Sequence, residues 1–199
     1  EQFGNLALIR DEPDFAIKNV ALIKDTGNVD YQFLYQELQT ASIISQLSAE
    51  MDGGTQKFIS LKKIRELNII YPEKKEQQKI GFIFQTSTTS LPFISVSLTA
   101  EDGEEIFPAE HVPAKGEGAR IRFHGFTGDW EQRKLGEIAT FINGRAYSQE
   151  ELLSSGKYKV LRVGNFYTND SWYFSDLELG DKYYAEEGDL LYTWSATFG

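Results

Sequence analysis

Few residues of this chain have the types and the spacing that catalysis requires. A nuclease metal site would combine a Pro-Asp pair with a following Asp/Glu-x-Lys motif. Pro13-Asp14 and Glu73-Lys74-Lys75 supply these pieces, but they lie far apart in the chain and in the wrong order of elements. Because fragments this short occur by chance, we interpret them as a coincidence and predict no nuclease site.

Other reactive side chains are equally sparse. The acidic residues between positions 181 and 189 lack the spacing of a calcium loop, and we expect a solvated turn there. Cys is absent, and His111 and His124 lie in an irregular region with no Ser/Asp constellation around them. The glycines fit neither the dinucleotide-binding nor the P-loop pattern. We therefore predict no catalytic residue, no metal and no cofactor.

Length and composition indicate a globular chain with a substantial core. The 199 residues suffice for one ordinary domain or two small ones, and 41% of them are hydrophobic. The longest apolar stretches are much too short to cross a membrane. No basic segment followed by an apolar one marks a secretory signal. We expect a cytoplasmic protein that does not engage a membrane.

The charge distribution is more informative than the net charge of −10. That average argues against nucleic-acid binding, because phosphate contacts need clustered Lys and Arg. Residues 55–80, however, carry seven basic and three acidic side chains, a local charge of +4. Composition leaves two interpretations open: a solvated helix face, or a loop and helix start whose donors suit phosphates and base edges.

Hydrophobic periodicity and capping signals predict a mixed α/β fold, with short helices on a twisted sheet. In the first part we expect strands at 5–9, 19–23 and 68–71, and helices at 31–51, 61–67 and 73–84, with Asp30 and Ser60 as N-caps. In the second part we expect a short helix or turn leading into a strand over 135–142, a capped helix over 148–156, and strands at 158–166, 172–177 and 189–194.

Several motifs occur in an order that resembles one family. They are Gly53 to Pro72 (GGTQKFISLKKIRELNIIYP), Glu76-Gln77 with Ile80, Phe126 to Gly136 (FTGDWEQRKLG), Gly156 to Arg162 (GKYKVLR) and Gly188 to Gly199 (GDLLYTWSATFG). Together these resemble the specificity (S) subunits of type I restriction–modification systems.

The resemblance implies that the chain is divided into three parts. It also implies that the chain is a fragment of the longer domain pattern of the family. Residues 1–82 would be the C-terminal part of one target-recognition domain, and 128–199 the N-terminal part of a second. Residues 83–127 would be an irregular linker where the family has a long conserved coiled-coil helix, here degraded or missing because Ser, Thr, Pro and Gly replace the apolar seam.

The two parts complement each other. Set head to tail, 128–199 followed by 3–82 would make about one complete recognition domain, circularly permuted. We therefore expect them to pack together in one chain, with contact between the strand at Asn5–Ile9 and the strand at Asp189–Trp194. The alternative is exchange between two chains as a swapped homodimer.

The resemblance also implies a function: non-catalytic, sequence-specific recognition of double-stranded DNA. Methylation and restriction subunits of the same system would be the partners that carry the catalysis. The alternative is a truncated or frame-disrupted remnant that binds partner subunits without reading DNA. The DNA-contact residues that we predict are Gln56, Lys57, Ser60, Lys62, Lys63, Arg145, Tyr147, Ser195 and Thr197.

Overall fold

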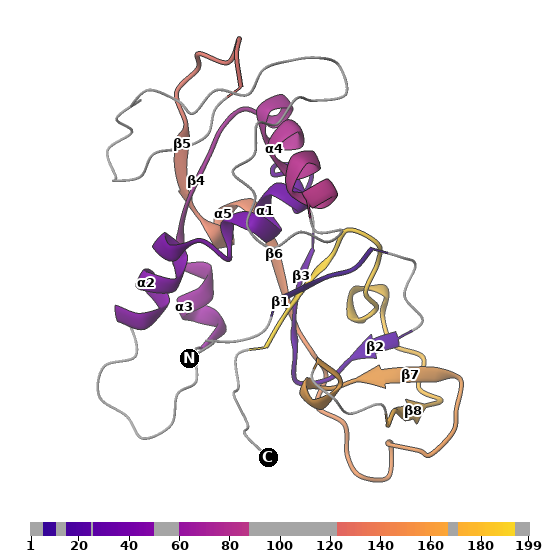
Figure 1. The fold of residues 1–199 in the computed structure, drawn as a ribbon. Coiled ribbons are helices and arrows are strands. Elements are labelled where there is room, and N and C mark those ends of the chain that lie inside the picture. Colours follow the sequence, from indigo (N-terminus) through magenta and orange to yellow (C-terminus); the bar gives the residue numbers. More distant parts are fainter. Residues whose placement is uncertain are drawn as a thin grey trace.

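The computed structural model describes residues 6–10, 15–24, 26–49, 60–87, 123–166 and 171–193 (Figure 1). Its helices are α1 (Tyr31–Glu37), α2 (Ala41–Ala49), α3 (Leu61–Arg65), α4 (Lys74–Ser87) and α5 (Leu135–Ile138). Its strands are β1 (Leu6–Leu8), β2 (Phe15–Ile17), β3 (Ala21–Lys24), β4 (Asn68–Tyr71), β5 (Glu131–Lys134), β6 (Thr140–Asn143), β7 (Tyr158–Leu161), β8 (Tyr173–Ser175) and β9 (Leu190–Tyr192). The mixed α/β fold predicted from the sequence is confirmed.

A four-stranded antiparallel sheet, in the order β1-β9-β3-β6, lies at the centre of the molecule. Both of its faces are buried, and successive residues of a strand enter different cores. In β3, Ile23 packs on one side and Leu22 on the other; in β9, Leu190 and Leu191 divide in the same way. This alternation follows from the two-residue period of a strand.

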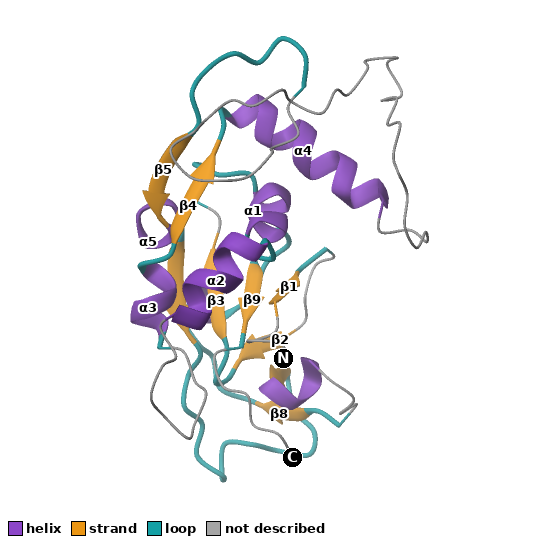
Figure 2. Cartoon of the chain, turned by 60° about the vertical axis from the view of Figure 1, so that its left-hand side comes forward, coloured by secondary structure: helices purple, strands orange, loops and turns teal. Residues whose placement is uncertain are grey.

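Helices cover the first face of the central sheet. Figure 2 shows α1 and α2 in front of the central strands, with α3 beside α2. The apolar side chains that these helices and α5 bring to the core are Phe33, Leu34, Ile43, Leu47, Ile64, Leu135 and Ile138. Each helix contributes only one or two buried residues, so their stability depends on packing against the sheet more than on helix propensity.

A smaller three-stranded sheet, β2-β7-β8, covers the second face (Figure 1). β2 runs parallel to β7, and β7 pairs antiparallel with β8. Ile17 of β2 and Leu161 of the 158–161 strand pack against Leu22 and Leu191 of the central sheet. The central sheet is thus enclosed between a helical layer and a second sheet.

A third, two-stranded sheet pairs β4 with β5, and α4 follows it. The side chain of Gln77 in α4 is fully buried. Its amide Nε2 donates to the carbonyl of Pro72 at 2.7 Å, and its Oε1 accepts from the backbone N–H of Asp30, also at 2.7 Å. Since Asp30 caps α1, Gln77 ties the start of α1 to α4. The predicted cap at Asp30 is confirmed.

Each of the three sheets formed by the described residues joins the two parts of the chain. β1 pairs with β9, with Leu6 opposite Tyr192 and Leu8 opposite Leu190. β2 pairs with β7, β3 with β6 and β9, and β4 with β5. The predicted contact between the strand near residues 5–9 and the strand near 189–194 is therefore confirmed.

Two predicted elements differ from those observed, and the strand β2 was not predicted. The helix predicted over 31–51 is two helices, because Thr40 interrupts it: its hydroxyl donates to the carbonyl of Glu37 at 2.8 Å and accepts from the N–H of Ile43 at 3.5 Å. The strand predicted to reach Phe166 ends at Leu161 and continues as a 3₁₀ turn. β2 occupies residues 15–17, just before the strand expected at 19–23.

The helix predicted over 148–156 does not form. The backbone N–H of Ser148 does donate to Glu151 at 2.8 Å, as in a capping box. Leu153, however, exchanges two backbone hydrogen bonds with Phe174, at 2.8 and 3.0 Å, and this extends the chain beside β8. Strand-like pairing therefore overrides the local helix signal.

The acidic turn at 181–189 is solvated only in part. Glu186 and Glu187 are exposed, but Asp189 is buried and lies 3.2 Å from Nζ of Lys24. Burial raises the pKa of Asp189, against the opposing effects of the Glu186 N–H and of Lys24. The expected solvated turn is therefore wrong for Asp189, which pairs with β3 across the two parts of the chain.

The join between the two parts can be tested at Gly144, which follows β6. A Cβ there would lie 2.8 Å from the Asn19 nitrogen and 3.0 Å from the Val20 oxygen, which are backbone atoms that cannot rotate away. We expect Gly144→Ala to lower the free energy of unfolding by roughly 1–3 kcal/mol in a denaturant titration. Gly180→Ala is the control, because a Cβ at Gly180 meets nothing within 4 Å. Equal midpoints for the two variants would contradict the packing at Gly144.

Candidate nucleic-acid interface

The start of α3 presents the first group of predicted contact residues. Ser60 is the N-cap, and its hydroxyl oxygen accepts from the N–H of Lys63 at 3.4 Å. The side chains of Lys62 and Lys63 are exposed. Ile64 is buried and anchors the helix to the core, so its neighbours face outward. The predicted cap at Ser60 is confirmed.

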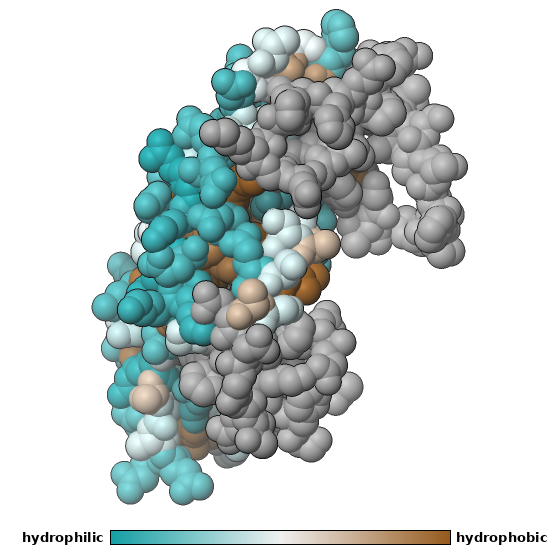
Figure 3. Space-filling view, turned by 90° about the vertical axis from the view of Figure 1, so that its left-hand side faces the viewer, coloured by the Kyte–Doolittle hydropathy of each residue, from teal (hydrophilic) through white to brown (hydrophobic). Residues whose placement is uncertain are grey.

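Arg65 adds a third cation to this face. Its Nη2 donates to the carbonyl of Phe141 at 3.3 Å, and its guanidinium carbon lies 5.5 Å from the centroid of the Phe141 ring. Gly136 permits this approach, because a Cβ there would lie 2.9 Å from Cβ of Arg65. We call Lys62, Lys63 and Arg65 the α3 surface. Figure 3 shows that the described part of this side of the molecule is largely hydrophilic.

The neighbouring strand β5 is charged but largely neutralised. Lys134 pairs with Glu66, and the ammonium group lowers the pKa of that carboxyl. Arg133 pairs with Glu131 at 3.2 Å. All four side chains are exposed, so these pairs contribute little to stability. They do reduce the charge that β5 could offer to phosphates.

A hollow of about 490 Å³ lies between the β4–β5 sheet and the start of α4. Its charged lining comprises four carboxylates, Glu73, Asp129, Glu131 and Glu137, and two cations, Lys74 and Arg133. This excess of negative charge disfavours an anionic ligand. Phosphate contacts on this side of the molecule therefore fit the α3 surface better than the hollow.

Arg145 and Tyr147, the second predicted group, are built into their loop. The Arg145 guanidinium donates to both oxygens of Glu151, at 2.9 and 2.7 Å, and lies 4.9 Å from the centroid of the Tyr147 ring. These bonds, with that from the Ser148 N–H, lower the pKa of Glu151 to about 2. The Tyr147 ring is buried, its pKa is raised by burial, and its hydroxyl has no partner among the described residues.

The structure does not bring the two predicted groups together. α3 belongs to the layer on the helical face of the central sheet. The backbone N–H of Arg145 donates to the carbonyl of Ile17 in β2, which belongs to the layer on the opposite face. The remaining predicted residues, Gln56, Lys57, Ser195 and Thr197, lie outside the described residues.

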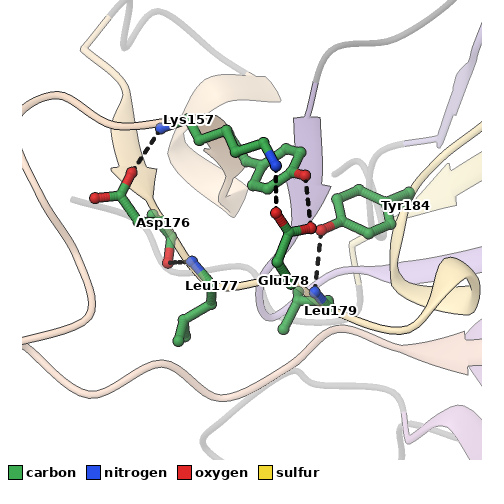
Figure 4. A network of polar contacts seen from close by, with 8 residues as sticks. Lys157, Asp176, Leu177, Glu178, Leu179 and Tyr184 are labelled. Carbon is green, nitrogen blue, oxygen red and sulfur yellow. Dashed lines mark hydrogen bonds and ion pairs between the residues drawn. The ribbon is translucent and has the colours of Figure 1, made fainter.

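Sequence reasoning did not anticipate the polar network beside β7. Figure 4 shows Glu178 accepting from the Lys157 ammonium group and from the Tyr158 hydroxyl, the latter at 2.8 Å. The N–H of Leu179 donates to the hydroxyl of Tyr184 at 3.1 Å. Lys157 lowers the pKa of Glu178 and is itself neutralised. Its partner is 21 residues away, so no local pattern could have identified the pair.

Within the described ranges, no group of three or more His, Cys, Asp or Glu residues could hold a metal ion. None of the helices found there is long and apolar enough to cross a membrane.

Comparison with known proteins identifies the family. Residues 3–92 and 127–199 match the sequence profile of the type I restriction modification DNA specificity domain. The two stretches cover most of the chain, which therefore belongs to this family, as the motifs predicted. No curated protein and no solved structure matches the chain significantly.

The Arg145–Glu151 pair gives a prediction about acid stability. Because the pKa of Glu151 is lowered from 4.5 to about 2, its contribution to stability is complete above about pH 4.5 and is lost as the pH falls toward 2. We expect wild type to be more stable than Glu151→Gln near neutral pH, with a difference that shrinks over this window. Urea titrations at several pH values measure this difference in the free energy of unfolding.

Glu150→Gln is the matched control, since Glu150 makes no hydrogen bond or ion pair with a described residue. Its stability should follow wild type across the same window. A constant difference between wild type and Glu151→Gln from pH 6 to pH 2 would show that the carboxylate is not held by Arg145.

Proposed function

We propose that this chain recognises a specific sequence in double-stranded DNA as part of a type I restriction–modification complex and is not itself catalytic. The observation that carries the proposal is the family match over two separate stretches that fold into one unit. Such a unit presents loops on a rigid sheet, the usual arrangement for recognition residues. Methylation and restriction subunits of the same system would be its partners and would carry the catalysis.

We further propose that the unit is one recognition domain in permuted order. Residues 128–199 would supply its N-terminal part and 1–82 its C-terminal part, with 83–127 as the connection. Pairing of β1 with β9 supports this arrangement, because it aligns the two strands that would be adjacent in the unpermuted order. We favour pairing within one chain, and exchange between two chains as a swapped homodimer is the alternative.

Phosphate contacts are proposed for the α3 surface. Lys62 and Lys63 are exposed at the start of α3. Cations of this kind position a protein on the duplex without reading sequence. Ser60 and the predicted residues Gln56 and Lys57, which precede α3 in the chain, would lie beside them and supply base contacts. Arg145, Tyr147, Ser195 and Thr197 stay candidates for the second group.

The charge of the α3 surface can be tested by binding to a duplex at several salt concentrations. Wild type should show affinity that falls steeply with log salt. Lys62→Ala combined with Lys63→Ala should weaken binding to all sequences alike and reduce the slope by about 1 to 2. Gln56→Ala should instead relax specificity at one base pair.

A charge-conserving double variant provides the control. Lys157→Ala combined with Glu178→Ala removes one neutralised pair from the network of Figure 4 and leaves the net charge unchanged. Its salt slope should equal that of wild type. A control slope that falls as much as that of the lysine variant would count against the α3 surface.

The alternative function is a protein-interaction remnant that binds partner subunits without reading DNA. The two functions differ in one measurement: a remnant binds no duplex even at low salt, alone or with the methylation subunits. Metal-dependent cleavage of DNA by the isolated chain would contradict both.

A further inference from the structure

Two cations beside the three-stranded sheet are neutralised by a carboxylate, but Arg162 pairs with no carboxylate among the described residues. Arg145 pairs with Glu151, and Lys157 with Glu178. Arg162, which directly follows β7, makes no ion pair with any described residue. No carboxylate in the part of the chain that the structure describes therefore compensates its charge.

Neutral groups fix the plane of the Arg162 guanidinium. Its carbon lies 4.3 Å from the centroid of the Tyr173 ring. Nη2 donates to the hydroxyl of Ser171 at 2.9 Å and to the carbonyl of Ser171 at 3.3 Å. Tyr173 is 36% exposed, so this stacked pair lies at the surface.

The backbone around Arg162 is fixed as well. Its N–H donates to Oδ1 of Asn165 at 3.1 Å, and Nδ2 of Asn165 donates to the carbonyl of Ser171 at 3.1 Å. Nε of Arg162 is buried and has no hydrogen-bond partner among the described residues. The head group is thus held in place by stacking and by Ser171 although one of its donors is left unsatisfied, which is a cost to stability.

We propose that Arg162 is a specificity-determining residue that reads the major-groove edge of a guanine. This inference rests on the function proposed above. A phosphate contact can be made by a charge in many orientations, including the point charge of a mobile lysine. Nη2 already donates to Ser171 and Nε is buried, so a contact with guanine would come from Nη1, which can donate to O6 or N7 only in a fixed orientation. Stacking on Tyr173 supplies the orientation, while the two hydrogens of Nη1 make no bond to a described residue.

The test begins with selection of duplexes from a random pool by the wild-type chain, alone and with its methylation subunits. Arg162→Lys and Arg162→Ala are then measured against the selected site and against single-base variants of it. We expect both to lose discrimination for one G·C pair by about tenfold or more, with affinity for unrelated DNA nearly unchanged. Lys182→Ala is the control: Lys182 also lies over a tyrosine, at 5.0 Å from the Tyr183 ring, and its loss should leave the selected site unchanged.

A second measurement does not depend on how the variants fold. Wild type is tested on duplexes in which 7-deazaguanine, which lacks the N7 acceptor, replaces each guanine of the selected site in turn. Replacement at one position should weaken binding of the wild-type chain to the selected site about as much as the Arg162→Lys substitution does. The same replacement should not weaken binding of the Arg162→Lys variant any further.

The outcomes separate the inference from the proposed function. If wild type selects no site and binds no duplex, both are overturned. If wild type selects a site but Arg162→Ala retains it, or weakens all duplexes equally, or no 7-deazaguanine position matters, the inference alone is overturned. Equal weakening of all duplexes would mark Arg162 as a phosphate contact.

Discussion

The arrangement of the whole molecule depends on the burial of both faces of the central sheet. β1 and β3 come from the first part of the chain, and β9 and β6 from the second, and they alternate in the order β1-β9-β3-β6. Neither part could bury its own strands, because each would lack its hydrogen-bonding neighbours and would expose apolar residues on two faces. Folding therefore requires the two parts to assemble together, and the positions of α3 and of the 145–151 loop follow from that assembly.

A second set of contacts fixes the connection between the parts. The buried amide of Gln77 bridges Pro72 and the α1 cap, so α4 leaves the β4–β5 sheet in one direction. Two residues further along the same helix, the Lys79 ammonium group lies 5.6 Å from the centroid of the Phe123 ring and 5.3 Å from that of Phe126. These cation–π contacts dock the end of the connection, just before the second part begins, onto α4. The pairing of β4 with β5 then continues directly from this docked segment.

Elements with strong local signals could be predicted from the sequence, and elements that depend on distant partners could not. The caps at Asp30 and Ser60 need only a side chain that accepts from a nearby N–H. β5 has no apolar alternation, since Glu131 to Lys134 are all polar; it is a strand because β4 offers an unpaired edge. The same holds for the site: Lys134 is neutralised by Glu66, 68 residues away, and which cations keep their charge is decided by such pairings.

The charge balance constrains how such a chain can approach DNA. With a net charge of −10, the molecule as a whole is repelled by a duplex at long range. Within about a Debye length of the duplex, roughly 8 Å at physiological salt, the electrostatic interaction depends instead on the protein charges nearest to the DNA. The cations of the described residues that lack a carboxylate partner include Arg65 and Arg162, and each lies on an aromatic ring. Such rings hold a guanidinium without cancelling its charge. Under the function proposed above, Arg65 and Arg162 would keep their charge for contact with DNA, whereas Arg145, which also lies over a ring, is neutralised by Glu151.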